Sequence, residues 1–283
     1  PALDAVRAAC PAARVAYLTG RGAAPLLEGD PRVDELITVT ARPGTAETLT
    51  LAARLREARQ GFRPDVLVAH PGWGESLFLK DVWPEARLGM YCEYFYRAEG
   101  ADVGFDPEFS SSDGSARGPR MAMKNLSMRL HFDLADAAWA PTRWQADSYP
   151  AGFRERIEVI HDGIDTAGIA PRADVSVVLG PGGPRLTRAD EVITFVNRNL
   201  EPSRGYHVFM RTLPELLRRR PRARVLIIGG DGASYGPMPR EGTWKERFAA
   251  EARGAMSAQD WARVHFLGRV PHSQFVALLQ LSR

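Results

Sequence analysis

Short apolar runs alternate with stretches of helical periodicity along most of the chain. In the first part, the runs predict strands at Arg14–Leu18, Glu35–Val39, Asp65–Ala69, Arg87–Met90, Ala137–Ala140 and Ile157–Ile160. The stretches between them predict helices at Thr45–Gln60, Glu75–Asp81, Pro119–Asp133 and Thr142–Ser148. Strands that are apolar on both faces and alternate with helices are typical of parallel sheets with helices on both sides.

The same alternation resumes near the end of the chain. Strands are predicted at Val192–Val196, Arg224–Ile228 and Arg263–Leu267, and helices at Tyr206–Arg220, Trp244–Ala252 and Ser273–Leu279. The stretch before them contains VVLGPGGPRLTRAD, whose glycines and prolines favour a linker. We therefore expect two doubly wound, Rossmann-like α/β domains at residues 1–165 and 191–283, joined by a linker at 166–190.

Both expected domains are short of a full doubly wound sheet. The second has only three strand–helix units, about half of such a sheet, and the first lacks an opening strand with a glycine-rich turn. The sequence therefore reads as an interior fragment of a longer protein, with the second domain truncated and the first also expected to be incomplete.

Composition and charge exclude several classes of protein. Cys10 and Cys92 are the two cysteines and cannot make a disulfide framework, which favours a reducing, cytoplasmic location. No run approaches the ~20 apolar residues of a membrane span, although peripheral contact with the inner face of the membrane stays open. The histidines are scattered without metal-ligand spacing, so no metal is expected. Residues 190–283 hold 15 Lys and Arg against 9 Asp and Glu. This balance suits an anionic ligand such as a nucleotide, whereas no aromatic interleaving supports nucleic-acid binding.

Two arginines lie in the polar loop that follows the strand at Val192–Val196. Arg198 and Arg204 stand six residues apart, and Gly205 then releases the chain into a helix. Guanidinium groups and the free amides at a helix start can hold an anion, whereas a solvated surface loop is the alternative. Polar or glycine-containing turns also follow other strands, in VIHDGID, IIGGDGASYG and VHFLGRVP. Ligands of open α/β sheets bind at such carboxyl ends of strands.

The succession VIHDGID, NRNLEPSRG, VLIIGGDG and VHFLGRVPHSQFVALLQ resembles the retaining glycosyltransferases of family 4, which have the two-domain GT-B fold. The resemblance implies that Arg198 and Arg204, with Gly205 in the same loop, hold the diphosphate of a nucleotide-sugar donor. It also places a turn along the nucleotide and a segment beside the base. The turn contains Gly229, Gly230 and Asp231, and the segment contains Gly268, Arg269 and Val270.

The resemblance assigns the acceptor to the first domain and to the cleft between the domains. His70 and Trp73 follow one predicted strand, and Glu93 and Tyr94 follow the next; these four are the candidate acceptor contacts. Trp73 is either a sugar-stacking or a buried side chain. Glu93 and Tyr94 stand where the family usually has a histidine near the reacting carbon. Glu93 is therefore predicted as the catalytic base or as an acceptor-binding carboxylate, with a solvated glutamate as the alternative.

The resemblance thus implies transfer of a hexosyl unit, with retention, from a nucleoside diphosphate sugar to a glycan, lipid or small-molecule acceptor. The catalytic candidates are Glu93, Arg198 and Arg204, and no cofactor is expected. The family's Glu-x7-Glu motif does not occur before residue 283, so we expect this chain alone to be inactive. A GT-B sugar-nucleotide epimerase and a non-catalytic fragment that binds nucleotide sugars remain as alternatives.

Overall fold

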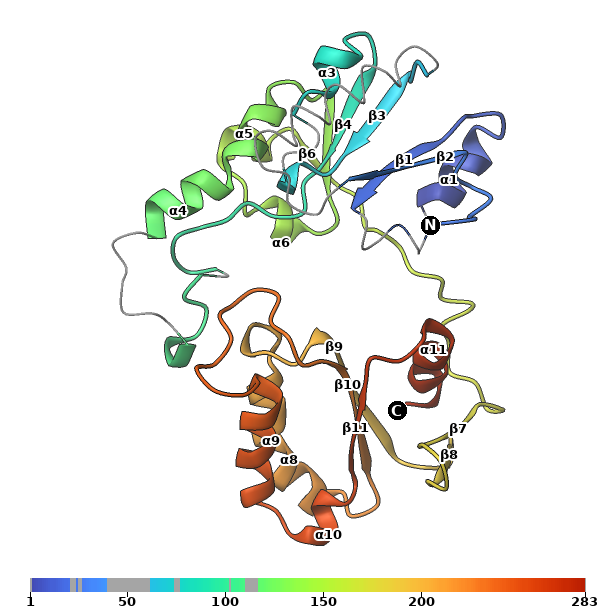
Figure 1. The fold of residues 1–283 in the computed structure, drawn as a ribbon, viewed down its shortest axis with the longest axis vertical. Coiled ribbons are helices and arrows are strands. Elements are labelled where there is room, and N and C mark those ends of the chain that lie inside the picture. Colours follow the sequence, from blue (N-terminus) through green and yellow to red (C-terminus); the bar gives the residue numbers. More distant parts are fainter. Residues whose placement is uncertain are drawn as a thin grey trace. The chain divides into compact units, whose positions relative to one another are not determined.

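The chain forms two compact units, residues 1–163 and residues 164–283 (Figure 1). The computed structural model describes residues 2–20, 24, 27–39, 62–73, 77–101, 103–109 and 117–282. The helix expected at Thr45–Gln60 lies outside the described residues, as does the start of the one expected at Glu75–Asp81. Within the described ranges, none of the helices is both long enough and apolar enough to cross a membrane.

The first unit contains two parallel sheets. After helix α1 (Ala2–Ala9), strand β1 (Ala16–Gly20) pairs with β2 (Glu35–Val39). The second sheet has four parallel strands in the order β3 (Val66–Ala69), β4 (Arg87–Tyr91), β5 (Ala137–Ala140) and β6 (Ile157–Val159). All six strands lie within two residues of their predicted positions, because each is an apolar run bounded by polar or turn residues.

Short helices and 3-10 turns connect the strands of the four-stranded sheet along the chain. The helices are α3 (Leu79–Val82), α4 (Arg117–Lys124), α5 (Leu126–Phe132), α6 (Arg143–Ala146) and α7 (Ala151–Arg154), and the 3-10 turns are η2 (Pro71–Trp73) and η3 (Pro107–Phe109). The single helix expected at Pro119–Asp133 is divided at Asn125. The buried Asn125 amide accepts a hydrogen bond from the N–H of Tyr96 (2.9 Å) and donates one to its carbonyl (2.7 Å). These two bonds tie the α4–α5 junction to the segment after β4.

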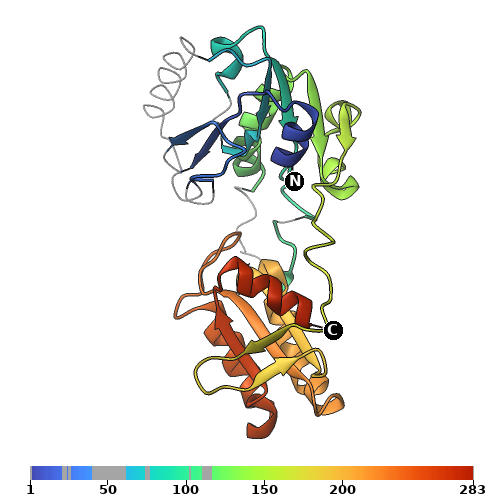
Figure 2. The same cartoon turned by 90° about the vertical axis from the view of Figure 1, so that its right-hand side faces the viewer.

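The second unit is a three-stranded parallel sheet with helices on both faces (Figures 1 and 2). The strand order is β11 (Val264–Gly268), β10 (Arg224–Gly230) and β9 (Val192–Asn199). Helices α8 (Tyr206–Arg219) and α9 (Trp244–Gly254) lie on one side of the sheet, and α11 (His272–Leu281) lies on the other. The short α10 (Ala258–Trp261) precedes β11. The central β10 is buried from Val225 to Gly229, as a strand covered on both faces requires.

Residues 166–190 differ from the linker that the sequence predicts. They contain an antiparallel hairpin, β7 (Ser176–Val178) and β8 (Arg185–Thr187), whose buried Leu186 packs with Leu278 and Leu281 of α11. The hairpin turn contains Gly180 and Gly182, which have positive φ angles of 72° and 71°. The segment is therefore a structural part of the second unit.

Candidate functional site

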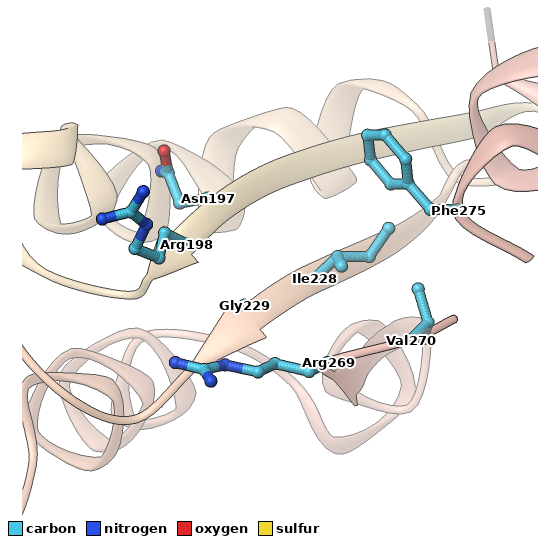
Figure 3. A pocket seen from close by; sticks show the side chains of 7 residues that line it. All are labelled: Asn197, Arg198, Ile228, Gly229, Arg269, Val270 and Phe275. Atoms are coloured by element: carbon cyan, nitrogen blue, oxygen red, sulfur yellow. The ribbon is translucent and has the colours of Figure 1, made fainter. Parts of the chain in front are cut away.

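A pocket of about 340 Å³ opens at the carboxyl ends of the strands of the second unit. Its basic and amide side chains come from the end of β9 and from the segment after β11. Its apolar side chains come from β10, from that same segment and from the start of α11 (Figure 3). The lining residues are Asn197, Arg198, Ile228, Gly229, Arg269, Val270 and Phe275. In Figure 3 the Arg198 guanidinium lies by the end of β9 and the Arg269 guanidinium by the tip of β10, while Val270 and Phe275 lie toward the other end of β10. The pocket therefore has a cationic end and an apolar end.

Arg198 supplies one charge of the cationic end. Its side chain is exposed, and no described residue forms an ion pair or hydrogen bond with its guanidinium. The neighbouring Asn197 donates a hydrogen bond through Nδ2 to the carbonyl of Arg204 (3.2 Å). This bond fastens the loop through η4 (Pro202–Arg204) to the end of β9. Gly205 then adopts a positive φ of 72°, which turns the chain from η4 into α8.

Arg204 does not line this pocket. Its guanidinium lies over the ring of Tyr235, 4.6 Å from the centroid, in a cation–π contact. The second cation in the pocket is Arg269, whose Nη2 donates to Asn199 Oδ1 at 3.2 Å. The structure thus brings Arg198 together with Arg269, a residue 71 positions away in the sequence.

In the glycine-rich turn at the end of β10, one of the three predicted residues lines the pocket and the other two lie outside its lining. Gly229 lines the pocket, and the carbonyl of Gly230 accepts a hydrogen bond from the N–H of Leu200 (2.9 Å). Asp231 forms an ion pair with Lys245 Nζ at 3.0 Å. Gly268 ends β11 with a positive φ of 65°, just before the two pocket residues Arg269 and Val270.

Glu201 is a residue of this region that sequence reasoning misses. It is 1% exposed, and its Oε2 accepts hydrogen bonds from the backbone N–H groups of Ser234 (2.8 Å) and Tyr235 (3.2 Å). The buried carboxylate therefore joins the loop after β9 to the loop after β10. A single acidic residue in a polar loop gives no sequence signal for such burial, because acidic residues usually remain in water.

A second polar cluster lies in the first unit, where β3 and β4 end. His70 Nε2 and Glu93 Oε2 are 2.8 Å apart. The N–H of Gly72 donates to His70 Nδ1 (3.2 Å), so Nδ1 is an acceptor and the ring proton lies on Nε2, facing Glu93. Two predicted acceptor residues thus form a hydrogen-bonded pair with a defined tautomer.

Tyr91 and Asp162 extend this cluster and were not among the predicted residues. The ring of Tyr91 lies 5.7 Å from that of His70, and its hydroxyl donates to Asp162 Oδ2 (2.9 Å). Burial, followed by the hydrogen bond to Asp162, raises the pKa of Tyr91 to about 12. The ring of the predicted Tyr94 is stacked on that of Trp144, with the ring centroids 5.4 Å apart. The side chain of Trp73 lies outside the described part of the chain.

In the described part of the chain, no three His, Cys, Asp or Glu side chains gather as a metal ion would require. That no metal or other cofactor takes part stays a prediction. The second unit offers guanidinium groups in its pocket, and the first unit offers one His–Glu pair and one Tyr–Asp pair.

Two parallel α/β units, with a ligand-sized pocket at the carboxyl ends of the second sheet, are the features of the GT-B fold. Residues 32–169 match the model of the glycosyl transferase family 4 group. This match, over just under half of the chain, supports the expected resemblance to glycosyltransferase family 4, and two solved structures share the GT-B fold. The match lies mainly in the first unit, whereas most of the motifs that carry the sequence resemblance lie in the second.

Solved structures share the fold at low sequence identity. A glycosyltransferase from Rickettsia africae ESF-5 superposes with a TM-score of 0.54 and 11% identity, over 95% of this chain and 71% of that one. The apo structure of OtsA gives a TM-score of 0.52 and 15% identity, over 84% of this chain and 55% of that one. A UDP-N-acetylglucosamine 2-epimerase gives a TM-score of 0.48 and 16% identity, over 95% of this chain and 73% of that one. No curated protein matches the chain.

Proposed function

We propose that this chain belongs to a retaining glycosyltransferase, which transfers a hexosyl unit from a nucleoside diphosphate sugar bound in the pocket of the second unit. The observation that carries the proposal is the division of the pocket into a cationic end and an apolar end. A nucleoside diphosphate has the same division, with an anionic diphosphate and a flat base. Pockets that combine apolar walls with a few convergent polar groups are typical ligand sites.

The charges of the pocket suit the chemistry of glycosyl transfer. When the bond between the sugar and the phosphate breaks, negative charge grows on the departing nucleoside diphosphate. A guanidinium that is already fixed in place stabilises this charge, and removal of one such donor costs about 3 kcal/mol or ~10²-fold in rate. Arg198 is in position for this role. Arg204 belongs to the same loop, and we propose that its guanidinium leaves the Tyr235 ring to contact the phosphates when the donor binds.

The acceptor is assigned to the first unit, at the His70–Glu93 pair. Glu93 is half exposed, so its carboxylate can meet a hydroxyl group of a glycan, a lipid or a small molecule. Because His70 donates its Nε2 proton to Glu93, the imidazole orients the carboxylate. In this proposal Glu93 binds the acceptor hydroxyl or takes its proton.

Calorimetric titration with UDP-, GDP- and ADP-glucose tests the donor site. We expect one of the three to bind to the parent chain, and Arg198→Gln to weaken that binding by about tenfold or more, because a charge-assisted contact to phosphate is lost. Arg253→Gln is the matched control, since Arg253 is an exposed arginine of α9 that does not line the pocket. Equal affinities for the parent and Arg198→Gln would count against the donor pocket.

The stereochemistry of any product tests the finer part of the proposal. Proton NMR of the anomeric centre is expected to show that the transferred sugar keeps the configuration it had in the donor. An inverted product would contradict retention. A nucleotide sugar that is changed only at its C2 centre, with no free nucleoside diphosphate, would favour an epimerase instead.

A further inference from the structure

We propose that Arg269 is an arm of the diphosphate site, so that Arg198 and Arg269 hold the two phosphates across Gly229. The family resemblance places the segment with Arg269 beside the base of the nucleotide. Here the Arg269 side chain contacts the phosphates instead. This assignment rests on the proposed function, because it assumes that the pocket binds a nucleoside diphosphate.

The first support is the way the Arg269 side chain is anchored. Its Nη2 donates to Oδ1 of Asn199, which is 6% exposed and is held by a second hydrogen bond from its Nδ2 to Ser234 Oγ (2.8 Å). An amide oxygen fixes the direction of a guanidinium without neutralising its charge. A guanidinium has five N–H donors, so this anchor leaves others for a ligand.

The second support is Gly230, whose lack of a side chain leaves room for the Arg269 guanidinium. A Cβ added at Gly230 would lie 2.7 Å from Arg269 Nε and 2.8 Å from Asn199 Oδ1. Any residue other than glycine would therefore displace either the guanidinium or its anchor. The absence of a side chain at Gly229 likewise leaves backbone as the pocket wall between the two arginines.

The third support is the direction in which Arg269 points. Figure 3 shows its guanidinium by the tip of β10, at the same end of the pocket as Arg198, whereas Val270 and Phe275 lie at the apolar end. Val270 is thus better placed than the Arg269 side chain to meet a base. Neither pocket arginine has a carboxylate partner among the described residues, so their charges add and favour a multiply charged anion.

The test compares a nucleoside diphosphate with inorganic pyrophosphate, which has no base. Titrations use UDP, GDP and ADP to find the one that binds most tightly to the parent chain, and pyrophosphate is then used as its competitor. We expect Arg269→Gln to weaken the binding of both that nucleotide and pyrophosphate by about tenfold or more. Gly230→Ala keeps the arginine but moves it, so it is expected to weaken both ligands as well. Arg253→Gln is expected to leave both affinities unchanged.

Other results would overturn the inference in distinguishable ways. If Arg269→Gln weakens the nucleotide but leaves pyrophosphate unchanged, the side chain contacts the base. If it changes neither, while circular dichroism shows an intact fold, Arg269 has no part in binding. If the parent binds none of the three nucleotides, the proposed function itself fails, and the inference fails with it.

Discussion

At the scale of single residues, several arginines of the second unit form ion pairs with carboxylates, whereas no described carboxylate pairs with the two arginines of the pocket. Arg211 pairs with Glu251, Arg219 with Glu215 and Arg263 with Asp260. Arg198 and Arg269 have no such carboxylate among the described residues, although both line a pocket. Such surface ion pairs are common and contribute little to stability, so the paired arginines need no role in binding. Two arginines without carboxylates in one pocket are consistent with a site for an anion.

Sequence reasoning identified part of this arrangement. Arg198 could be predicted because a strand, an arginine loop and a helix start follow one another locally. The partnership of Arg198 with Arg269 could not, because it depends on which strands are neighbours in the sheet. His70 and Glu93 were both expected at strand ends, but their 2.8 Å contact required knowledge that β3 and β4 are adjacent.

The two cysteines are expected to differ sharply in reactivity. Cys92 is fully buried, and burial raises the pKa of its thiol to about 12, whereas Cys10 is exposed. The thiolate is the reactive form, so Cys92 stays protonated and inert near pH 8. Titration with a thiol reagent should therefore give one thiol per chain under native conditions and two in denaturant. Rapid reaction of both thiols in the native protein, or loss of the fast thiol only in Cys92→Ser, would contradict this assignment.

At the scale of elements, apolar runs were a good guide and turn residues a poorer one. The strands of both units lie close to their predicted positions, because a strand covered on both faces leaves a continuous apolar run in the sequence. The sequence favours a linker where the β7–β8 hairpin forms, because the glycines and prolines of a hairpin turn resemble those of an irregular connection. The break between α4 and α5 was missed because it depends on tertiary hydrogen bonds from Asn125 to Tyr96.

Strand β11 carries a group that should make the second unit sensitive to acid. Burial and the nearby Arg224 guanidinium lower the pKa of His265 below its usual value of 6.5. Below that pH the unfolded chain binds a proton that the folded chain resists, so the stability of the fold is expected to decrease as the pH falls through this range.

Chemical denaturation of the wild type and His265→Gln between pH 8 and pH 5 measures the effect. We expect a smaller loss of unfolding free energy toward pH 5 in the variant than in the wild type. His272→Gln, at the start of α11, is the control and is expected to keep the wild-type slope. Identical slopes for the wild type and His265→Gln would remove His265 as the cause.

At the scale of the whole molecule, each unit has buried clusters of its own. The clusters of the first unit surround Met90, Phe132, Val82 and Leu88, and those of the second include Leu226, Ile228 and Leu278. The pocket is lined only by residues of the second unit. A unit with its own core can in principle fold alone.

We therefore expect residues 164–283 alone to fold and to keep the nucleotide affinity of the whole chain. Residues 1–163 alone are expected to bind no nucleoside diphosphate. Circular dichroism establishes folding, and the same calorimetric titration measures binding. Strong nucleotide binding by residues 1–163 would contradict the assignment of the donor site to the second unit. So would a folded second unit that does not bind the nucleotide.

The most direct measurement is a crystal structure of the chain with the tightest-binding nucleoside diphosphate. We expect the phosphates to lie over Gly229, within hydrogen-bond distance of Arg198, with the base against Val270 and Phe275. A nucleotide found at His70 and Glu93 instead, or one whose phosphates point away from the arginines, would contradict a donor pocket in the second unit.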